Sequence, residues 1–159
     1  VLPGFLREST RPVAASDYWL KNPVRTFFGR DVLNAVLINR DPADRDPDED
    51  PVALMVAAVD EGASLIIFPE GMRNQTEELV LEFKTGLFHL ARLRPEIDLV
   101  PVWIDNLNSV LPKGEIVPVP LICTVTFGAP LHIRPAEDKE LFLDRARAAL
   151  AGLAKARET

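Results

Sequence analysis

Short runs of apolar, often β-branched residues alternate along this chain with longer stretches whose apolar residues recur every three or four positions. The short runs predict strands, and the longer stretches predict helices. Strands are expected at 11–16, 35–40, 64–68, 98–104 and 121–128. Helices are expected at 22–34, 51–61, 82–93 and 135–156. This alternation predicts an α/β fold in which a largely parallel sheet is flanked by helices.

Local signals refine this prediction. Asp50 before Pro51 is typical of a helix N-cap followed by proline at the first helical position, and Gly62 is typical of a helix end. Between Val110 and Pro130 the pattern predicts two strands or turns without a helix between them, so the sheet is expected to be mixed. No linker divides the 159 residues, and we expect a single domain over residues 1–159.

Composition and local sequence patterns argue against several kinds of partner and site. The net charge of −6 argues against a nucleic-acid partner, which normally meets a basic face. Residues 41–50 hold six acids, but the prolines among them and the lack of a Ca²⁺-loop spacing favour a solvated loop, and no metal is expected. The single cysteine, Cys123, lies in an apolar run and is expected to be buried and inert. No run reaches the ~20 apolar residues of a membrane span.

Charged residues follow two of the predicted strands. Glu70, Gly71 and Arg73 come after the strand 64–68, and Arg40 ends the strand 35–40. Ligands of open α/β sheets gather at the carboxyl ends of strands. Two interpretations are open: Glu70 and Arg73 form a local surface ion pair, or Arg73 presents its guanidinium to a phosphate while Gly71 allows close approach of the backbone.

The sequences at these positions resemble motifs of the glycerolipid (lysophosphatidic acid) acyltransferase family. FPEGMR (68–73) is similar to the third motif of that family, AVLINR (35–40) to the second and LVPVWI (99–104) to the fourth, while FKTG (83–86) resembles the segment that commonly follows the third. The resemblance covers roughly residues 11–128. Met72 departs from it, because the family usually has threonine there, and Asn74 and Gln75 stand where serine is common.

The resemblance implies a glycerol-3-phosphate acyltransferase-like fold and an acyl transfer in phospholipid biosynthesis. The acyl group would pass from acyl-CoA or acyl-carrier protein to the hydroxyl of a lysophosphatidate-type glycerolipid, without a cofactor. The implied substrate-binding residues are Arg40, Glu70, Gly71 and Arg73. Arg73 would bind phosphate and Arg40 would add positive charge. Glu70 and Gly71 would shape the pocket, or Glu70 would orient Arg73.

The first motif of the family, His-x-x-x-x-Asp, supplies its catalytic base, and the 159 residues do not contain it. His89 is followed five positions later by Arg94. His132 is followed by Glu137, a superficial match that lies after the fourth motif and is interrupted by Pro135. We therefore expect the motif upstream of Val1 and little activity from this chain alone. The alternative is a non-catalytic lipid- or phosphate-binding pseudoenzyme.

Residues 17–30 combine the aromatic Trp19, Phe27 and Phe28 with Lys21, Arg25 and Arg30. This combination suits a membrane interface. The other interpretation is that the aromatic rings face the core and the cations face water. With the implied lipid substrate, we expect a cytoplasmic protein at the inner face of the membrane.

Overall fold

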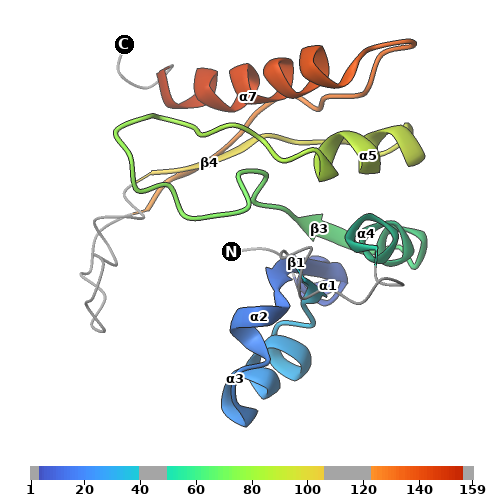
Figure 1. Ribbon diagram of the computed structural model, residues 1–159, viewed down its shortest axis with the longest axis vertical. Helices are drawn as coiled ribbons and strands as arrows, with labels where there is room; N and C mark the ends of the chain where they lie inside the picture. Colours follow the sequence, from blue (N-terminus) through green and yellow to red (C-terminus); the bar gives the residue numbers. More distant parts are fainter. Residues whose placement is uncertain (1–3, 40–49, 106–122, 156–159) are drawn as a thin grey trace. The chain divides into compact units, whose positions relative to one another are not determined.

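The computed structural model describes residues 4–39, 50–105 and 123–155 (Figure 1). Contacts within the chain group it into two compact units, one of Val1–Arg73 with Lys84–Arg94 and one of Asn74–Phe83 with Pro95–Thr159. The expectation of a single domain over residues 1–159 stays a prediction.

The first unit contains most of the helices and a parallel sheet. Its elements in chain order are α1 (Gly4–Ser9), β1 (Thr10–Ala15), α2 (Ser16–Trp19), α3 (Pro23–Phe27), η1 (Phe28–Val32), β2 (Val36–Ile38), α4 (Pro51–Asp60), β3 (Ser64–Ile66) and α5 (Gly86–Leu93). The predicted strands 11–16, 35–40 and 64–68 are therefore present, each slightly displaced or shortened.

The sheet has the order β2-β1-β3, and both ladders are parallel. The two halves of β1 have different partners. Thr10 pairs with Ser64 of β3, and Val13 pairs with Val36 of β2. Pro12 lies where β1 passes from one partner to the other, and it has no N–H to donate to a ladder. The ladders confirm the predicted parallel sheet.

Helix α4 has the ends that its sequence predicts. The Asp50 carboxylate accepts a hydrogen bond from the Val52 N–H at 2.9 Å, and Pro51 occupies the first turn. Gly62 follows the helix with φ +86°, a conformation that favours glycine. Met55 and Ala58 of α4 are buried, and α4 packs against β2, β3 and α5. The helix therefore covers one face of the sheet.

Helix α5 packs on α4 with Phe88, Leu90 and Ala91 buried. Arg94, directly after α5, donates to both carboxylate oxygens of Asp60, and the bond to Oδ1 measures 2.6 Å. The hydrogen bond from Arg94 lowers the pKa of Asp60 below its ordinary value. The helix begins at Gly86, four residues later than the sequence predicts.

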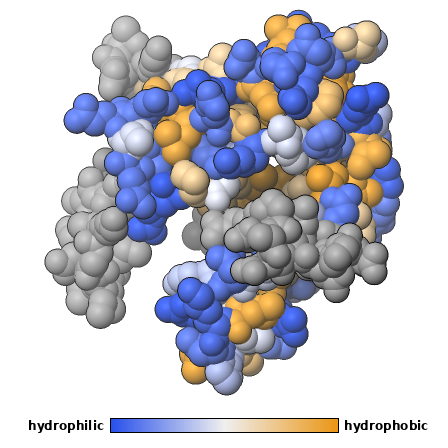
Figure 2. Space-filling view, in the orientation of Figure 1, coloured by the Kyte–Doolittle hydropathy of each residue, from blue (hydrophilic) through white to orange (hydrophobic). Residues whose placement is uncertain are grey.

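The segment from α2 to η1 is largely exposed. Asn22 caps α3 by accepting from the Arg25 N–H at 2.9 Å, and the helix continues as a turn of π-helix. Phe27 and Phe28 are 55% and 48% exposed, so the interpretation that these rings face the core is wrong for the two phenylalanines. Figure 2 shows hydrophobic and hydrophilic residues side by side over this segment, at the bottom of the view.

The second unit combines an antiparallel ladder with the long C-terminal helix. Its elements are β4 (Val102–Ile104), β5 (Val125–Phe127) and α7 (Lys139–Lys155). Trp103 pairs with Thr126, and the Pro101 carbonyl accepts from the Gly128 N–H at 2.8 Å. Helix α7 packs on β4, and its Phe142 is fully buried. The described residues therefore form a parallel sheet and a separate antiparallel one. The α/β class is confirmed, but neither of these two sheets is itself mixed as the sequence predicts.

Two predictions for this unit need correction. Cys123 is exposed, so the expectation of a buried thiol is wrong. Residues two apart in a strand point to the same face, and Val125 and Phe127, on the same alternation as Cys123, are 48% and 64% exposed. The C-terminal helix begins at Lys139 instead of near Pro135, because Ala136 has φ +59° and interrupts a helical path.

No helix in the described segments is long and apolar enough to cross a bilayer.

Candidate functional site

The loop after β3 makes a tight turn at the position where the sequence places its charged motif. The Gly71 N–H donates to the Phe68 carbonyl at 3.0 Å, which closes the turn. Gly71 has φ +69°, a left-handed conformation in which a Cβ is unfavourable. The glycine of the motif is thus required by the backbone of the turn. Glu70 and Arg73 belong to this loop, which begins just beyond β3 of the parallel sheet.

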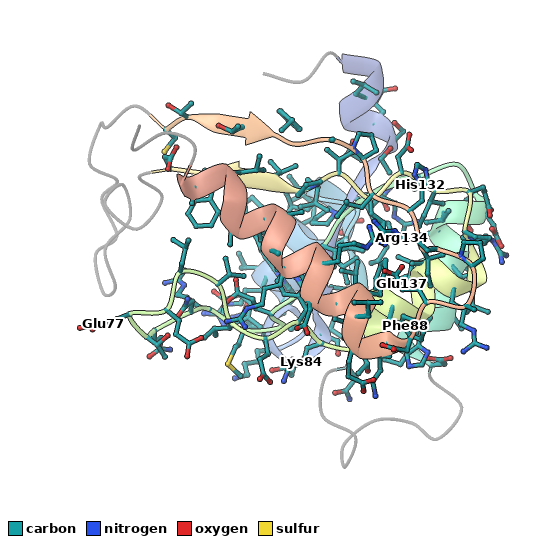
Figure 3. The ribbon with its side chains drawn as sticks, turned by 90° about the horizontal axis from the view of Figure 1, so that it is seen from above. Glu77, Lys84, Phe88, His132, Arg134 and Glu137 are labelled. Atoms are coloured by element: carbon teal, nitrogen blue, oxygen red, sulfur yellow. The ribbon has the colours of Figure 1, made fainter. Side chains whose placement is uncertain are left out.

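Lys84 covers this turn. Its N–H donates to the Pro69 carbonyl at 2.8 Å, which holds the residue beside the motif. A Cβ added to Gly71 would lie 3.1 Å from Lys84 Cγ and 3.5 Å from Lys84 Cε. The apolar part of the lysine therefore runs along the backbone of the glycine, and Figure 3 labels the residue. Nothing in the residue pattern alone singled out Lys84, although FKTG (83–86) marked its surroundings.

Arg73 is exposed and has no hydrogen-bond or ion-pair partner anywhere in the described segments. Glu70, by contrast, is half-buried. The interpretation of these two residues as a local ion pair is therefore wrong for the described structure, and the guanidinium of Arg73 is available to an external anion. The fourth predicted site residue, Arg40, lies outside the described residues.

The two histidines do not reproduce a His-x-x-x-x-Asp arrangement. His132 Nε2 lies 2.8 Å from Asp98 Oδ1, and both side chains are largely exposed. Glu137, five positions after His132, bonds instead to Arg145, and this hydrogen bond lowers the pKa of Glu137. Figure 3 shows His132, Arg134 and Glu137 in the segment ahead of α7. His89 is exposed and contacts the Phe88 ring edge-on.

The described segments contain no group of three or more His, Cys, Asp or Glu side chains that could hold a metal ion. The motif itself supplies one cation, Arg73, one carboxylate, Glu70, and the glycine turn, and Lys84 lies beside them. Such a group can bind and orient an anion through charge-assisted hydrogen bonds. It offers no histidine or thiol for proton transfer or nucleophilic attack.

Comparison with known proteins identifies the family. A sequence model described as Acyltransferase matches residues 3–105. The chain belongs to the acyltransferase family. This confirms the resemblance inferred from the motifs, and the matched range includes the turn, Lys84 and β4.

Two curated relatives are 1-acyl-sn-glycerol-3-phosphate acyltransferases. The protein of Cocos nucifera is 33% identical over 85 residues, which are 54% of this chain and 27% of the relative. The protein of Saccharomyces cerevisiae is 45% identical over 49 residues, which are 30% of this chain and 16% of the relative. The chain thus matches less than a third of the length of either relative.

A solved structure has the same fold. It is the 1-acyl-sn-glycerophosphate (LPA) acyltransferase PlsC from Thermotoga maritima, with a TM-score of 0.70 and 19% identity. The match covers 95% of this chain and 58% of the Thermotoga chain. The similarity confirms the predicted α/β fold of the acyltransferase family.

Proposed function

We propose that this chain carries the acceptor site of an enzyme that acylates a lysophosphatidate-type glycerolipid in phospholipid biosynthesis. One observation carries the proposal: Arg73 is exposed and unpaired in the described structure, on a glycine turn directly beyond a strand of the parallel sheet. An arginine fork suits the oxygens of a phosphate monoester. The printed names of the curated relatives support the same class of acceptor.

The reaction needs a base that this site does not offer. A glycerol hydroxyl is a weak nucleophile until a positioned base takes its proton, and such a base contributes about 10²–10⁴-fold to the rate. The hydroxyl oxygen then attacks the thioester of acyl-CoA or acyl-carrier protein, and the thiol leaves. In this proposal the base comes from residues outside these 159, and the chain by itself binds acceptor but transfers acyl groups poorly. Beyond the acyl donor, no cofactor or metal is required.

The first experiment measures binding and separates the phosphate from the rest of the lipid. A short-chain lysophosphatidate and the monoacylglycerol with the same acyl chain are titrated into the protein below their critical micelle concentrations. We expect tighter binding of lysophosphatidate, and an Arg73→Gln variant that loses this preference. Arg92→Gln is the matched control, because Arg92 is also exposed and unpaired in the described structure. Equal affinity of the wild-type chain for both lipids would contradict the proposal.

A second candidate is a non-catalytic module that binds phosphorylated lipids. Met72, which is 59% exposed where the family usually has a hydroxyl side chain, favours this alternative. Both candidates bind lysophosphatidate, so the discriminating measurement is turnover. Acylation by the protein together with its natural flanking sequence would show that it is an enzyme. Binding without turnover in that protein would favour the non-catalytic module.

We also propose that the protein works at the inner, cytoplasmic face of a membrane. The exposed Phe27 and Phe28 support this proposal, since Arg25 and Arg30 lie on the same short helical segment. In a flotation assay, the wild-type chain should rise with vesicles that contain phosphatidylglycerol. The Phe27→Ala/Phe28→Ala variant should stay at the bottom of the gradient. Phe127→Ala removes an exposed ring from β5 and serves as the control. Identical flotation of all three proteins would contradict membrane docking through this segment.

A further inference from the structure

We infer that Lys84 is a second cation for the acceptor phosphate, brought to the Arg73 turn from a separate segment of the chain. The inference rests on the proposed function and adds a residue that the sequence motif does not contain. Ten residues separate Arg73 from Lys84, so sequence spacing gives no reason to group them. The grouping comes from the fold of the first unit, which contains both residues.

The backbone fixes where the lysine begins. The Lys84 N–H donates to the carbonyl of Pro69 at 2.8 Å, and Pro69 lies within the turn that the Gly71–Phe68 hydrogen bond closes. Helix α5 begins two residues later at Gly86, whose Cβ position would lie 3.7 Å from Met55 of α4. Lys84 is thus held between a hydrogen bond to the turn and a helix packed on α4.

The glycine fixes where the side chain goes. The Cβ position of Gly71 lies 3.1 Å from Lys84 Cγ, 3.9 Å from Cδ and 3.5 Å from Cε. Three successive carbon atoms therefore follow the glycine backbone, and Nζ is one bond beyond the last of them. A side chain at position 71 would occupy this path. Gly71 has a second role besides its positive φ, because it makes the room in which the lysine lies.

The charges match a phosphate monoester better than a carboxylate. Neither Lys84 nor Arg73 has an ion-pair partner in the part of the chain that the structure describes, and both are exposed. A phosphate monoester carries a charge of about −1.5 to −2 near neutral pH and three acceptor oxygens. The fork of Arg73 can engage two oxygens, and the ammonium of Lys84, which is a point charge with three donors, can engage the third.

The test compares variants that separate the charge of Lys84 from its apolar part. Lys84→Met keeps a chain of similar length over Gly71 and removes the charge, whereas Lys84→Arg keeps the charge. Lys139→Met is the control, since Lys139 lies at the start of α7 with a side chain that is 43% exposed. Affinities for short-chain lysophosphatidate and for the matching monoacylglycerol are measured at several salt concentrations, with thermal unfolding recorded for each variant.

We expect Lys84→Met to weaken lysophosphatidate binding about tenfold, the size of one lost charge-assisted hydrogen bond at an exposed site. Binding of monoacylglycerol should not change, and the salt dependence for lysophosphatidate should become shallower. Lys84→Arg should retain most of the affinity, and Lys139→Met all of it.

Three results would overturn the inference. Unchanged lysophosphatidate affinity in Lys84→Met, with a loss in Arg73→Gln, would leave the proposed function standing without Lys84. An equal loss of affinity for both lipids in Lys84→Met would mean that the lysine supports the turn and does not meet phosphate. A wild-type chain that does not distinguish the two lipids would overturn the proposed function, and the inference with it.

Discussion

Glu137 and Arg145 form a two-point ion pair in the second unit. Arg145 donates from Nε and Nη2 to the Glu137 carboxylate at 2.8 and 2.7 Å, and the Glu137 side chain is only 1% exposed. The carboxylate also accepts from the Arg134 N–H at 2.9 Å, and Arg145 donates to the His132 carbonyl at 2.8 Å. The pair therefore ties the segment ahead of α7 to the helix itself.

This pair should make stability depend on pH in the acid range. The hydrogen bonds from Arg145 lower the pKa of Glu137 from its ordinary value of 4.5, so the unfolded state takes up a proton more readily than the folded state. The stabilisation is present above about pH 4.5 and is lost as the pH falls through the lowered folded pKa. Glu137→Gln should lower the free energy of unfolding by about 1.5–3 kcal/mol at pH 7.

Urea unfolding of the wild type and Glu137→Gln between pH 7 and pH 3 checks this expectation. The difference between the two proteins should shrink as the pH falls. Glu140→Gln is the control, because the Glu140 side chain is 76% exposed and pairs with Lys139 at 3.4 Å. A constant difference between wild type and Glu137→Gln at every pH would show that the charge of the carboxylate is not the cause.

Substitution of Gly71 should disturb the turn in two ways, by backbone strain and by a contact with Lys84. Gly62 allows the strain to be tested without the contact. Gly71→Ala places a Cβ at φ +69° and 3.1 Å from Lys84 Cγ. Gly62→Ala places one at φ +86° with nothing within 4 Å, so it has the backbone strain without the contact. We expect each to lower the free energy of unfolding by about 1–2 kcal/mol, and Gly71→Ala alone to weaken lysophosphatidate binding.

Gly152→Ala completes this series. Gly152 lies within α7 with open space around its Cβ position, and alanine there should stabilise the helix by about 0.5–1 kcal/mol. Thermal unfolding and lipid titration of the three variants give the comparison. If Gly62→Ala weakens lipid binding as much as Gly71→Ala, then strain in the first unit, and not displacement of Lys84, accounts for the loss.

Arg147 should stabilise the segment between Arg73 and Lys84. From α7 its Nε donates to the Val80 carbonyl at 3.0 Å, and its Nη2 lies 3.2 Å from the Glu78 carboxylate. Val80 is buried, so loss of the arginine would leave its carbonyl with fewer donors. Arg147→Met should cost about 1–3 kcal/mol.

Hydrogen exchange and urea unfolding measure the effect of Arg147→Met. Amides of residues 78–83 should exchange faster in the variant. Arg92 of α5 is exposed and has no partner in the described structure, so the Arg92→Met variant should unfold at the same urea concentration as the wild type. The same urea midpoint for both variants would rule out a stabilising role for the bond to Val80.

Removal of the oxygen acceptor that caps α4 should lower the free energy of unfolding. Asp50 accepts from the Val52 N–H at 2.9 Å, and Asp50→Ala removes this acceptor from the first turn. We expect a loss of about 0.5–2 kcal/mol, most of which Asp50→Ser should restore. Chemical denaturation of the three proteins tests this. A serine variant as unstable as the alanine variant would indicate that the cap bond contributes little.

The sequence predicted elements whose causes are local. Asp50, Pro51 and Gly62 define the ends of α4 by short-range chemistry, and the structure has them as expected. Cys123 is exposed although its apolar neighbours predict burial, because apolar residues do not show which face of a two-stranded ladder is covered. Among the site residues, the Glu70–Gly71–x–Arg73 turn was predictable from its motif. The place of Lys84 was not, because it depends on one backbone hydrogen bond from Lys84 to Pro69, two residues that are far apart in sequence.

The divided pairing of β1 has a consequence for the order in which the first unit forms. Val36, the partner of Val13, is near it in sequence, whereas Ser64, the partner of Thr10, is more than twice as far along the chain. Closing the shorter loop costs less entropy, and its strand also leaves the ribosome earlier. The β1–β2 ladder is therefore expected to assemble first during synthesis. The turn that holds Arg73 follows β3, so it takes shape only when the second, more distant strand has joined.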